Sequence, residues 1–416
     1  MIKELTIEKT SLPVGWEMKK IDEVVIDYHQ GLNTAGQKIK FVEEGYPIIQ
    51  TRNLNQGEID ISSKIKFMSK VDWELYKDKY KPSVGDVFLT NIGTIGKTAV
   101  VTIEEDYLIH WNIFIFKLDK SKVLPLYLKL FLDSPSSFDY YHSFQKGGTV
   151  SFITKKMISN LEIPLPPLPQ QKQIVAILDK AFAAIDTAKA NAEQNLQNAK
   201  ELFESYLQNV FENKGDDWEE KTLGDVLQKT ETVNPKSTPN NEFVYLDVSS
   251  VNKETKLIEK TTTLLGKDAP SRARKLVKTN DIIFATVRPT HSRVAIITDE
   301  YNNQVCSTGY YVLRPKSIIE NHYLFYFILT FSFNKLMESM QKGASYPAVN
   351  NKEVESVVIN FPKSIKEQQK IVERLDSLST ETKKLEAIYT QKIADLEEMK
   401  KSVLQKAFSG QLNTIN

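Results

Sequence analysis

The fold is decided by the stretch PPLPQQKQIVAILDKAFAAIDTAKANAEQNLQNAKELFESYLQNVF (166–211) and by its second version, PKSIKEQQKIVERLDSLSTETKKLEAIYTQKIADLEEMKKSVLQKAF (362–408). Each version opens after a proline with a glutamine pair, continues with Ile-Val and Leu-Asp, and ends on phenylalanine. A long segment that returns after about half of the chain predicts a duplicated architecture. The rest of the sequence is therefore best read as two halves laid side by side.

Both versions carry the spacing of a coiled coil. Apolar or small residues recur at alternating steps of three and four over more than four heptads, which predicts one long helix per version, each on the order of 60 Å. Because one helix cannot bury its own seam, we expect the two to pack on each other and to present a face to partners. The expected seam and partner-interface residues are Ile174, Leu178, Ile185, Leu196, Phe203, Val210, Ile371, Leu375, Leu378, Leu385, Leu396 and Val403. A plain dimerisation coiled coil is the alternative that periodicity alone leaves open.

Composition sets the limits within which these helices must work. The chain has 416 residues, 41% of them hydrophobic, which predicts two or three domains. No apolar run is long enough for a membrane span, and no signal peptide opens the chain. A single cysteine, Cys306, excludes an internal disulfide and fits a reducing cytoplasm. Since the net charge is only +1, a nucleic-acid binder would have to gather its positive charge on one face.

The segments outside the helices are also repeated. Each half opens at a tryptophan, Trp16 and Trp218, and continues through β-branched runs that predict strands. A short aromatic helix is expected at 125–134 and again at 321–331, and QKGG (145–148) parallels QKGA (341–344). The predicted fold class is α+β, with two mixed α/β domains separated by the two long helices. The expected boundaries are 1–165 and 214–362 for the domains, 166–213 and 363–410 for the helices, and 411–416 for a tail.

The order and duplication of these motifs resemble a known family, the specificity subunits of type I restriction-modification systems. The resemblance covers essentially the whole chain and is carried by LPVGW (12–16), VGDVFLTNIGTIGKTAVV (84–101), the QKGG and QKGA pair, and PLPQQKQIVAILD (167–179) with EQQKIVERLD (367–376). It implies two target-recognition domains, each of which binds half of a bipartite site on double-stranded DNA. The antiparallel helices would act as a ruler between them.

The resemblance also implies partners and assigns the chemistry to them. Two methyltransferase subunits would dock on the helices, and motor-nuclease subunits would join through them. S-adenosylmethionine, ATP and Mg are expected on those partners, with no cofactor or metal in this chain. The chain itself is expected not to be an enzyme, because its five histidines show no metal-ligand spacing and no cofactor loop is present. Two alternatives stay open: a coiled-coil scaffold without DNA specificity, and a complex that only methylates.

Candidate DNA contacts come from cations near turns. NIGTIGKT (91–98) is not a P-loop, since the first glycine of that motif is replaced by Asn91. We instead expect a glycine-rich turn between strands in which Lys97 contacts a phosphate. The second half has VRPTHSRVAI at the aligned place, inside a basic run from Lys267 to Arg293. The full set of expected DNA contacts is Arg52, Asn53, Lys97, Lys146, Arg272, Arg274, Lys275, Arg288, Arg293 and Lys342.

Overall fold

The computed structural model describes residues 12–55, 57–62, 64–143 and 152–412. The chain divides into two compact units, which are described here separately. The first unit comprises residues 1–191 and 391–416, and the second comprises residues 192–390. Each unit therefore contains one α/β domain together with part of each long helix.

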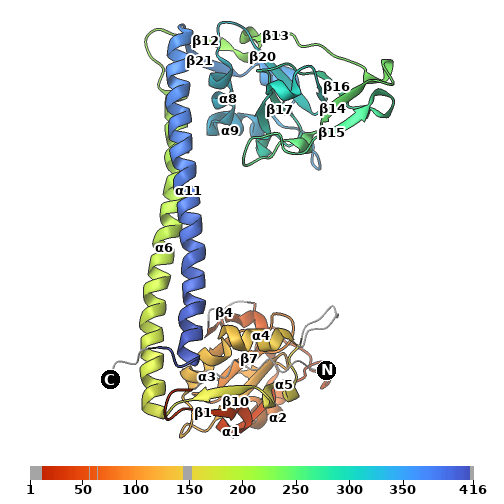
Figure 1. The fold of residues 1–416 in the computed structure, drawn as a ribbon. Helices are drawn as coiled ribbons and strands as arrows, with labels where there is room; N and C mark the ends of the chain where they lie inside the picture. Colours follow the sequence, from red (N-terminus) through yellow and green to blue (C-terminus); the bar gives the residue numbers. More distant parts are fainter. Residues whose placement is uncertain (1–11, 56, 63, 144–151, 413–416) are drawn as a thin grey trace. The chain divides into compact units, whose positions relative to one another are not determined.

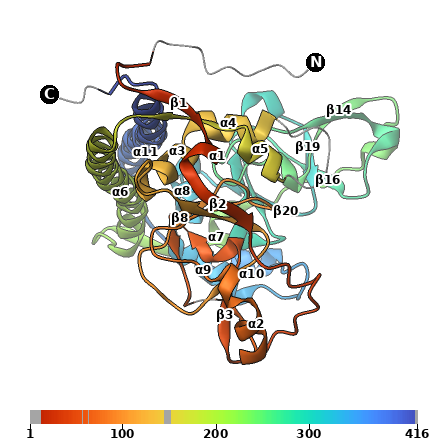
Figure 2. The same ribbon diagram turned by 90° about the horizontal axis from the view of Figure 1, so that it is seen from below.

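The first unit is built on a four-stranded antiparallel sheet in the order β2-β10-β7-β8 (Figure 1). A three-stranded sheet, β6-β3-β9, pairs β3 with β9 in parallel, and β1 pairs with β11. Helix α3 packs on β7 and β8 and lies between that sheet and the long helices (Figure 2). The elements are β1 (Glu17–Lys20), α1 (Ile21–Val24), β2 (Val25–Gln30), β3 (Tyr46–Ile49), η1 (Thr51–Asn53), β4 (Leu54–Asn55), β5 (Glu58–Ile59), β6 (Lys66–Met68), α2 (Lys70–Tyr80), β7 (Val87–Thr90), β8 (Thr98–Val100), β9 (Leu108–Ile109), β10 (Ile113–Leu118), α3 (Pro125–Leu132), α4 (Pro135–Ser143), α5 (Lys155–Ser159) and β11 (Glu162–Leu165).

The second unit repeats this plan. Its four-stranded sheet has the order β13-β20-β17-β18, a second sheet has the order β15-β14-β19-β16, and β12 pairs with β21. Strands β14 and β19 are parallel, as β3 and β9 are in the first unit. The elements are β12 (Trp218–Thr222), α7 (Leu223–Val226), β13 (Leu227–Gln228), η2 (Pro235–Ser237), β14 (Glu242–Leu246), η3 (Val248–Ser250), β15 (Thr262–Leu265), η4 (Gly266–Asp268), β16 (Ala273–Leu276), β17 (Ile282–Ala285), η5 (Pro289–His291), β18 (Val294–Ile296), η6 (Asp299–Tyr301), β19 (Val305–Ser307), β20 (Tyr310–Pro315), α8 (Asn321–Leu329), α9 (Phe331–Met340), α10 (Asn351–Glu355) and β21 (Val358–Pro362).

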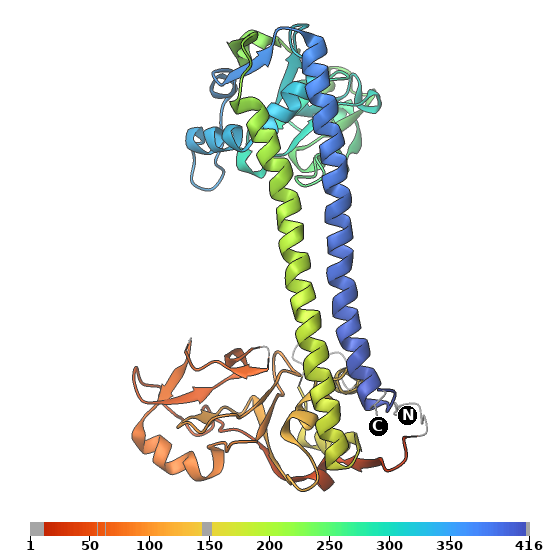
Figure 3. The ribbon, with the colours of Figure 1, turned by 90° about the vertical axis from the view of Figure 1, so that its left-hand side faces the viewer.

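The long helices are α6 (Leu168–Glu212) and α11 (Ile365–Phe408), and they run side by side within each unit (Figure 3). In the first unit Lys189 pairs with Glu397 at 2.6 Å, and Asp186 pairs with Lys400 at 2.7 Å. The residue number falls along α11 as it rises along α6, so the pair is antiparallel, as expected. Five buried positions in α6 recur every seven residues, the spacing of a coiled coil; they are Gln171, Leu178, Ile185, Ala192 and Ala199, and α6 also buries Ile174, Leu207 and Phe211.

The seam is narrower than the heptad pattern predicts. Of the expected seam residues, Ile174, Leu178, Ile185 and Leu375 are buried, while Leu196, Phe203, Val210, Ile371, Leu378, Leu396 and Val403 are half-buried. Leu385 is 40% exposed, so it is not buried between the two helices and its predicted place in a partner interface stays open; the buried residue in that turn is Thr382. Toward the middle of the helices the buried positions hold the small residues Ala192, Ala199 and Thr382, and most of the neighbouring heptad residues are only half-buried.

The glutamine pair of the sequence has a structural explanation. Gln171 is fully buried, and its Oε1 accepts from the backbone N–H of Leu124 at 2.9 Å. Its Nε2 donates to the carbonyl oxygens of Lys122 and Pro166 at 2.8 and 2.9 Å. One side chain thus satisfies the polar backbone at the start of α3 and at the entry to α6, where an unpaired group would be costly.

The second copy makes the same three bonds. Gln368 is fully buried and accepts from the N–H of Glu320 at 2.7 Å. It donates to the carbonyl oxygens of Ile318 and Pro362 at 3.0 and 2.8 Å. A glutamine at this place therefore belongs to the common frame of both units.

The closing phenylalanines also have equivalent roles. Phe408 ends α11 with its ring edge against Tyr127 and Phe131 of α3, at centroid distances of 5.2 and 5.5 Å. Phe211 near the end of α6 contacts two rings of α8 at 5.0 and 5.5 Å. Each domain is thus attached to the end of the helix whose sequence closes on that phenylalanine.

Candidate nucleic-acid interface

In the first unit, several loops meet at one edge of the sheets. The N–H of His110, after β9, donates to the carbonyl of Ile49 at the end of β3, at 2.9 Å. The N–H of Asn91, after β7, donates to the carbonyl of Asn112 at 3.0 Å. We call this the first turn edge and define it as residues 50–55, 91–97, 110–112 and 152–153. Loops carried by rigid strands in this way are common positions for binding residues.

The second unit has the equivalent edge. The N–H of Thr286, after β17, donates to the carbonyl of Gly309 at 2.9 Å, and the N–H of Val349 donates to the carbonyl of Thr286 at 2.9 Å. The second turn edge comprises residues 247–252, 286–293, 308–309 and 342–349. The backbone bonds of Thr286 match those of Asn91 one for one, because Ile153 donates to Asn91 at 2.8 Å.

Lys97 has a partner inside the protein. The N–H of Lys97 bonds to the Thr90 hydroxyl at 2.9 Å, and its Nζ donates to the carbonyl of Leu54 at 2.9 Å and to Asn55 Oδ1 at 3.4 Å. The ammonium thus ties the turn after β7 to the segment after η1. Within the protein this contact shapes the edge, and the expected phosphate contact of Lys97 stays a prediction. Strand β8, not a helix, follows this turn, which is not the strand–loop–helix arrangement of a P-loop.

Arg293 occupies the position of Lys97 in the second unit. It follows the η5 turn, and its carbonyl accepts from the N–H of Ala285 at 3.0 Å, as the carbonyl of Lys97 accepts from Thr90. Its Nη1 donates to the carbonyl of Val251, the residue after η3. The Nζ of Lys256 donates a second hydrogen bond to this turn, to the carbonyl oxygen of Ser292 at 2.7 Å. Burial lowers the pKa of the Lys256 ammonium. Both Lys97 and Arg293 are therefore clamps between two loops.

Arg52 and Asn53 separate into an exposed and a buried residue. Arg52 is exposed in η1 at the first turn edge, where the predicted contact with DNA stays open. Asn53 is 1% exposed, and its Oδ1 accepts from the N–H of Gln50 at 3.1 Å. The prediction that Asn53 reaches a base is wrong, because this side chain closes the η1 turn from within.

The basic run from Lys267 to Arg293 is likewise divided. Arg272 is exposed, and its carbonyl accepts from the N–H of Thr308 at 2.8 Å, beside the second turn edge. The half-buried Arg274 guanidinium donates to the Ser271 carbonyl and to Asn234 Oδ1. Lys275 is half-buried inside β16, opposite Cys306 of β19. Arg274 and Lys275 lie in the sheet and are half-buried, whereas Arg272 is exposed; the predicted DNA contacts of all three stay predictions.

Arg288 lies exposed on the second turn edge beside an aromatic residue that the sequence reading missed. Its guanidinium is 5.0 Å from the ring centroid of Tyr346, a side chain that is 71% exposed. The available signal was a tyrosine four residues after Lys342 in the QKGASYPAV loop. Lys342 has an 82% exposed side chain, and its Nζ pairs with Glu353 at 2.9 Å. Its counterpart Lys146 lies outside the described residues.

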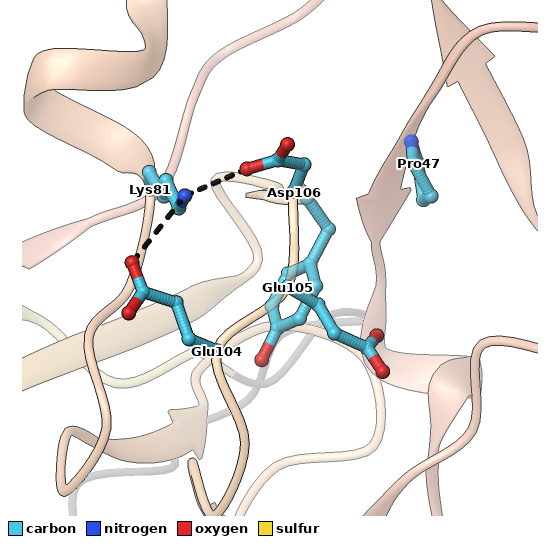
Figure 4. Close-up of a pocket in the computed structure, with 6 residues that line it drawn as sticks. Pro47, Lys81, Glu104, Glu105 and Asp106 are labelled. Carbon is cyan, nitrogen blue, oxygen red and sulfur yellow. Dashed lines mark hydrogen bonds and ion pairs between the residues drawn. The ribbon is translucent and has the colours of Figure 1, made fainter.

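A hollow elsewhere on the first unit is unsuited to a polyanion. It is lined by Pro47, Lys81, Glu104, Glu105, Asp106 and Tyr107. In Figure 4 the ammonium of Lys81 lies between two carboxylates, with Asp106 at 2.6 Å and Glu104 at 3.6 Å. The one cation of this hollow is outnumbered by acids. The turn edges, with their exposed arginines, are the better candidates.

The described part of the chain holds neither a cluster of metal ligands nor a membrane-spanning helix. Among these residues, no group of three or more His, Cys, Asp or Glu is placed to hold a metal ion. No helix among them is both long enough and apolar enough to cross a membrane.

Comparison with known proteins now identifies the class. The family model described as type I restriction modification DNA specificity domain matches residues 13–198 and again 215–397. The chain belongs to this family and carries two copies of its domain. The specificity subunits of the type I restriction enzymes MjaX and MjaVIII, from Methanocaldococcus jannaschii, are similar proteins with 26% and 25% identity. Those alignments cover 99% and 97% of this chain, and 97% and 95% of the relatives.

Solved structures support the fold. A chain from a structural study of assembly and conformational transition in a type I R-M system matches with a TM-score of 0.76 at 18% identity, over 96% of this chain and 99% of that one. The HsdS subunit from Thermoanaerobacter tengcongensis matches with a TM-score of 0.61 at 19% identity, over 96% and 98%. The resemblance inferred from the sequence is confirmed, and this chain is a non-catalytic specificity subunit with two recognition domains.

Proposed function

We propose that this chain selects a bipartite double-stranded DNA target, with one half-site read by the turn edge of each unit. The observation that supports this proposal is that the two units share the same buried hydrogen bonds but expose different side chains at their turn edges. The buried glutamines Gln171 and Gln368 make the same bonds, while Arg52 on one edge and Arg288 on the other have no exposed counterpart of the same kind. Two readers of two different sequences need this combination.

Electrostatics favours DNA as the ligand of these edges. A net charge of +1 gives no general attraction to a polyanion, so binding depends on local cations. Arg52 on the first edge, and Arg288 with the neighbouring Arg272 on the second, are exposed at loops that rigid strands hold in place. Arginine binds phosphate and reads guanine, so both affinity and specificity are available from it.

The long helices offer a surface for protein partners. They carry large apolar side chains that are 40 to 59% exposed; these are Leu202, Leu385, Ile388 and Met399. We infer that they dock two methyltransferase subunits, through which motor-nuclease subunits join the complex in the cytoplasm. S-adenosylmethionine, ATP and Mg would then be bound by those partners. In this proposal the partners catalyse the reactions, and this chain selects the DNA site at which they act.

A binding selection from random duplex DNA tests the proposal. The full chain would be co-purified with the methyltransferase of its own cell, and bound duplexes would be enriched and sequenced. We expect two short blocks separated by a fixed gap of unselected bases. Enrichment of no sequence, with binding that hardly responds to salt, would favour the alternative of a protein-interaction scaffold.

Two rearrangements test the division of labour. Exchange of residues 1–165 for those of another specificity subunit should change one block only, and a change in both would contradict independent readers. Insertion of one heptad into each long helix should lengthen the gap. An unchanged gap would contradict the idea that the helices set the spacing.

A further inference from the structure

The turns after β7 and β17 have equivalent backbone bonds at their two ends, but the second turn is one residue longer and contains the 3-10 turn η5. In the first unit the left-handed positions are Gly93 and Gly96, with φ of 79° and 86°. In the second unit the equivalent positions are Arg288 and Ser292, with φ of 51° and 46°. Glycine adopts this conformation freely, whereas an L-residue with a Cβ does so at a cost. The second unit therefore accepts backbone strain where the first avoids it.

The equivalence of Gly93 and Arg288 rests on hydrogen bonds. Each lies two residues beyond the first residue after the strand, Asn91 or Thr286, whose N–H donates to the residue just before β10 or β20. In each unit the residue just before this position forms a β-bridge to a later loop: Ile92 pairs with Phe152, and Val287 pairs with Ala348. A strained residue at the position where the other repeat has glycine points to a function for its side chain.

The Arg288 side chain is held in one place. Its N–H donates to the carbonyl of Pro347 at 2.7 Å, and its Nη2 lies 3.4 Å from the Ser345 carbonyl. Its guanidinium carbon lies over the ring of Tyr346, 5.0 Å from the ring centroid, and Tyr346 belongs to a loop that two backbone bonds between Lys342 and Ala348 close. The ring of Tyr346 is 71% exposed, so the contact buries little and cannot be explained by core packing.

We propose that Arg288, oriented by Tyr346, reads a base pair in the half-site of the second unit, and that Tyr346 is its positioning residue. This inference rests on the function proposed above. A phosphate contact needs only a positive charge within reach, which a flexible side chain supplies without strain. A base contact requires a guanidinium plane with a fixed direction, because arginine reads the O6 and N7 of guanine with two parallel bonds. The left-handed backbone and the stacked ring fix that direction.

The first test compares Arg288→Gly with the wild-type chain in the random-duplex selection, using the full complex. We expect the first block and the gap to persist, while the preference at one base pair of the second block falls roughly 10- to 100-fold. Arg288→Gly should also melt at or above the temperature of Arg288→Ala, because glycine removes the backbone strain. Loss of binding with retained stability separates a DNA contact from a folding defect.

Lys229→Ala is the matched control for loss of one exposed positive charge in the same unit. Lys229 is exposed and directly follows β13, which pairs with β20 at Arg314. The second turn edge lies at the other end of β20, beside Tyr310, so Lys229 is away from it. We expect its selected sequence to equal that of the wild type. Equal relaxation by Lys229→Ala and Arg288→Gly would overturn the proposal, since general charge would then explain both.

Two variants of Tyr346 test its positioning role. Tyr346→Phe keeps the ring and should leave the selected sequence unchanged, whereas Tyr346→Ala should weaken the preference at the same base pair that Arg288→Gly affects. Uniform weakening across sequences, with a salt slope reduced by about 0.9, would overturn base reading in favour of a phosphate contact. An unchanged second block in both Arg288→Gly and Tyr346→Ala would overturn the inference while the bipartite motif of the wild type kept the proposed function intact.

Discussion

The turns at 91–97 and 286–293 occupy equivalent places in the two units and are held by equivalent backbone bonds, but their exposed residues differ. Both are closed by a cation that reaches a carbonyl just after a 3-10 turn, Lys97 to Leu54 and Arg293 to Val251. Between the fixed ends, one turn has exposed glycine where the other has exposed arginine. In these turns the aligned cations bond within the protein, whereas Arg288, which stands where the first unit has glycine, is exposed.

This comparison changes which of the positively charged residues is the best candidate for a DNA contact. A lysine or arginine in a glycine-rich turn of a DNA-binding domain is normally taken as a phosphate contact. Here the aligned cations Lys97 and Arg293 serve the protein backbone, while Arg288, which has no aligned cation, is exposed. Comparison of the two repeats of one chain can therefore distinguish residues that hold the fold from residues that are exposed to a ligand, without an alignment to other proteins.

The largest expected effect comes from the buried glutamines. Gln171→Leu and Gln368→Leu each remove one acceptor and two donated bonds from buried backbone, so we expect each to lower the free energy of unfolding by about 2–4 kcal/mol. Hydrogen–deuterium exchange of 120–132 and 316–329 reports the two units separately. Each variant should increase exchange mainly in its own unit.

The neighbouring Gln369 provides the control. Its side chain is exposed, so Gln369→Leu should change the unfolding free energy by less than about 0.5 kcal/mol. If one of the two buried glutamines proved replaceable without loss, the units would not share a common frame, and the comparison of their turns would lose its basis.

The clamps should give a smaller effect. Lys97→Met and Arg293→Met each remove a charged donor from a carbonyl, with an expected loss of about 1–2 kcal/mol in unfolding free energy. DNA affinity should fall because the turn edge loosens, but the slope of log K against log salt should stay constant. Titrations at several salt concentrations measure that slope. A decrease of about 0.9 for either variant would restore it as a phosphate contact.

The left-handed positions should give effects of opposite sign. Gly93→Ala meets no atom within 4 Å of the added Cβ, so its cost is backbone strain alone, about 1 kcal/mol. Arg288→Gly should be more stable than Arg288→Ala by a similar amount. Chemical denaturation of the three variants and the wild type measures both differences. Equal stability of the two Arg288 variants would show that the second turn relaxes out of the left-handed region.

Much of the architecture follows from the sequence alone. Heptad spacing over 166–211 and 362–408 predicts two long helices, which α6 and α11 match to within three residues at each end, and the repeated motifs predict the two domains. These signals are local or are carried by the repeat itself. The helix seam is predicted less well: Leu385 fits the heptad as well as Leu375 does, and only the packed neighbours decide which of them is buried.

The site is less predictable because its partners are distant in sequence. Lys97 bonds to a carbonyl 43 residues away, and Arg293 to one 42 residues away. No local pattern shows that a cation faces inward to such a group. The burial of Asn53 in its own turn was equally hidden, whereas the tyrosine that stacks on Arg288 was visible in the sequence and was overlooked.

The smallest expected effect is a difference in pH dependence between the units. Burial lowers the pKa of His110 below its usual value of 6.5, so folding favours the neutral ring; this stabilisation is present above about pH 6.5 and is lost as the pH falls below it. Glu320 raises the pKa of His322 through a hydrogen bond and its charge, so that stabilisation is present below about pH 6.5 and is lost as the pH rises through the folded pKa.

Acidification from pH 7.5 to 5.5 should therefore weaken the first unit through His110 and strengthen the second through His322. Exchange measured at both pH values, with rates corrected for intrinsic pH dependence, follows each unit. His110→Gln should remove part of the acid-side loss in the first unit, and His322→Gln should remove the gain in the second. The exposed His291 is the control, since His291→Gln should alter neither. If both histidine variants shifted stability in the same direction, the opposite surroundings of the two rings would not be expressed in folding, and the two units would differ in their turn edges alone.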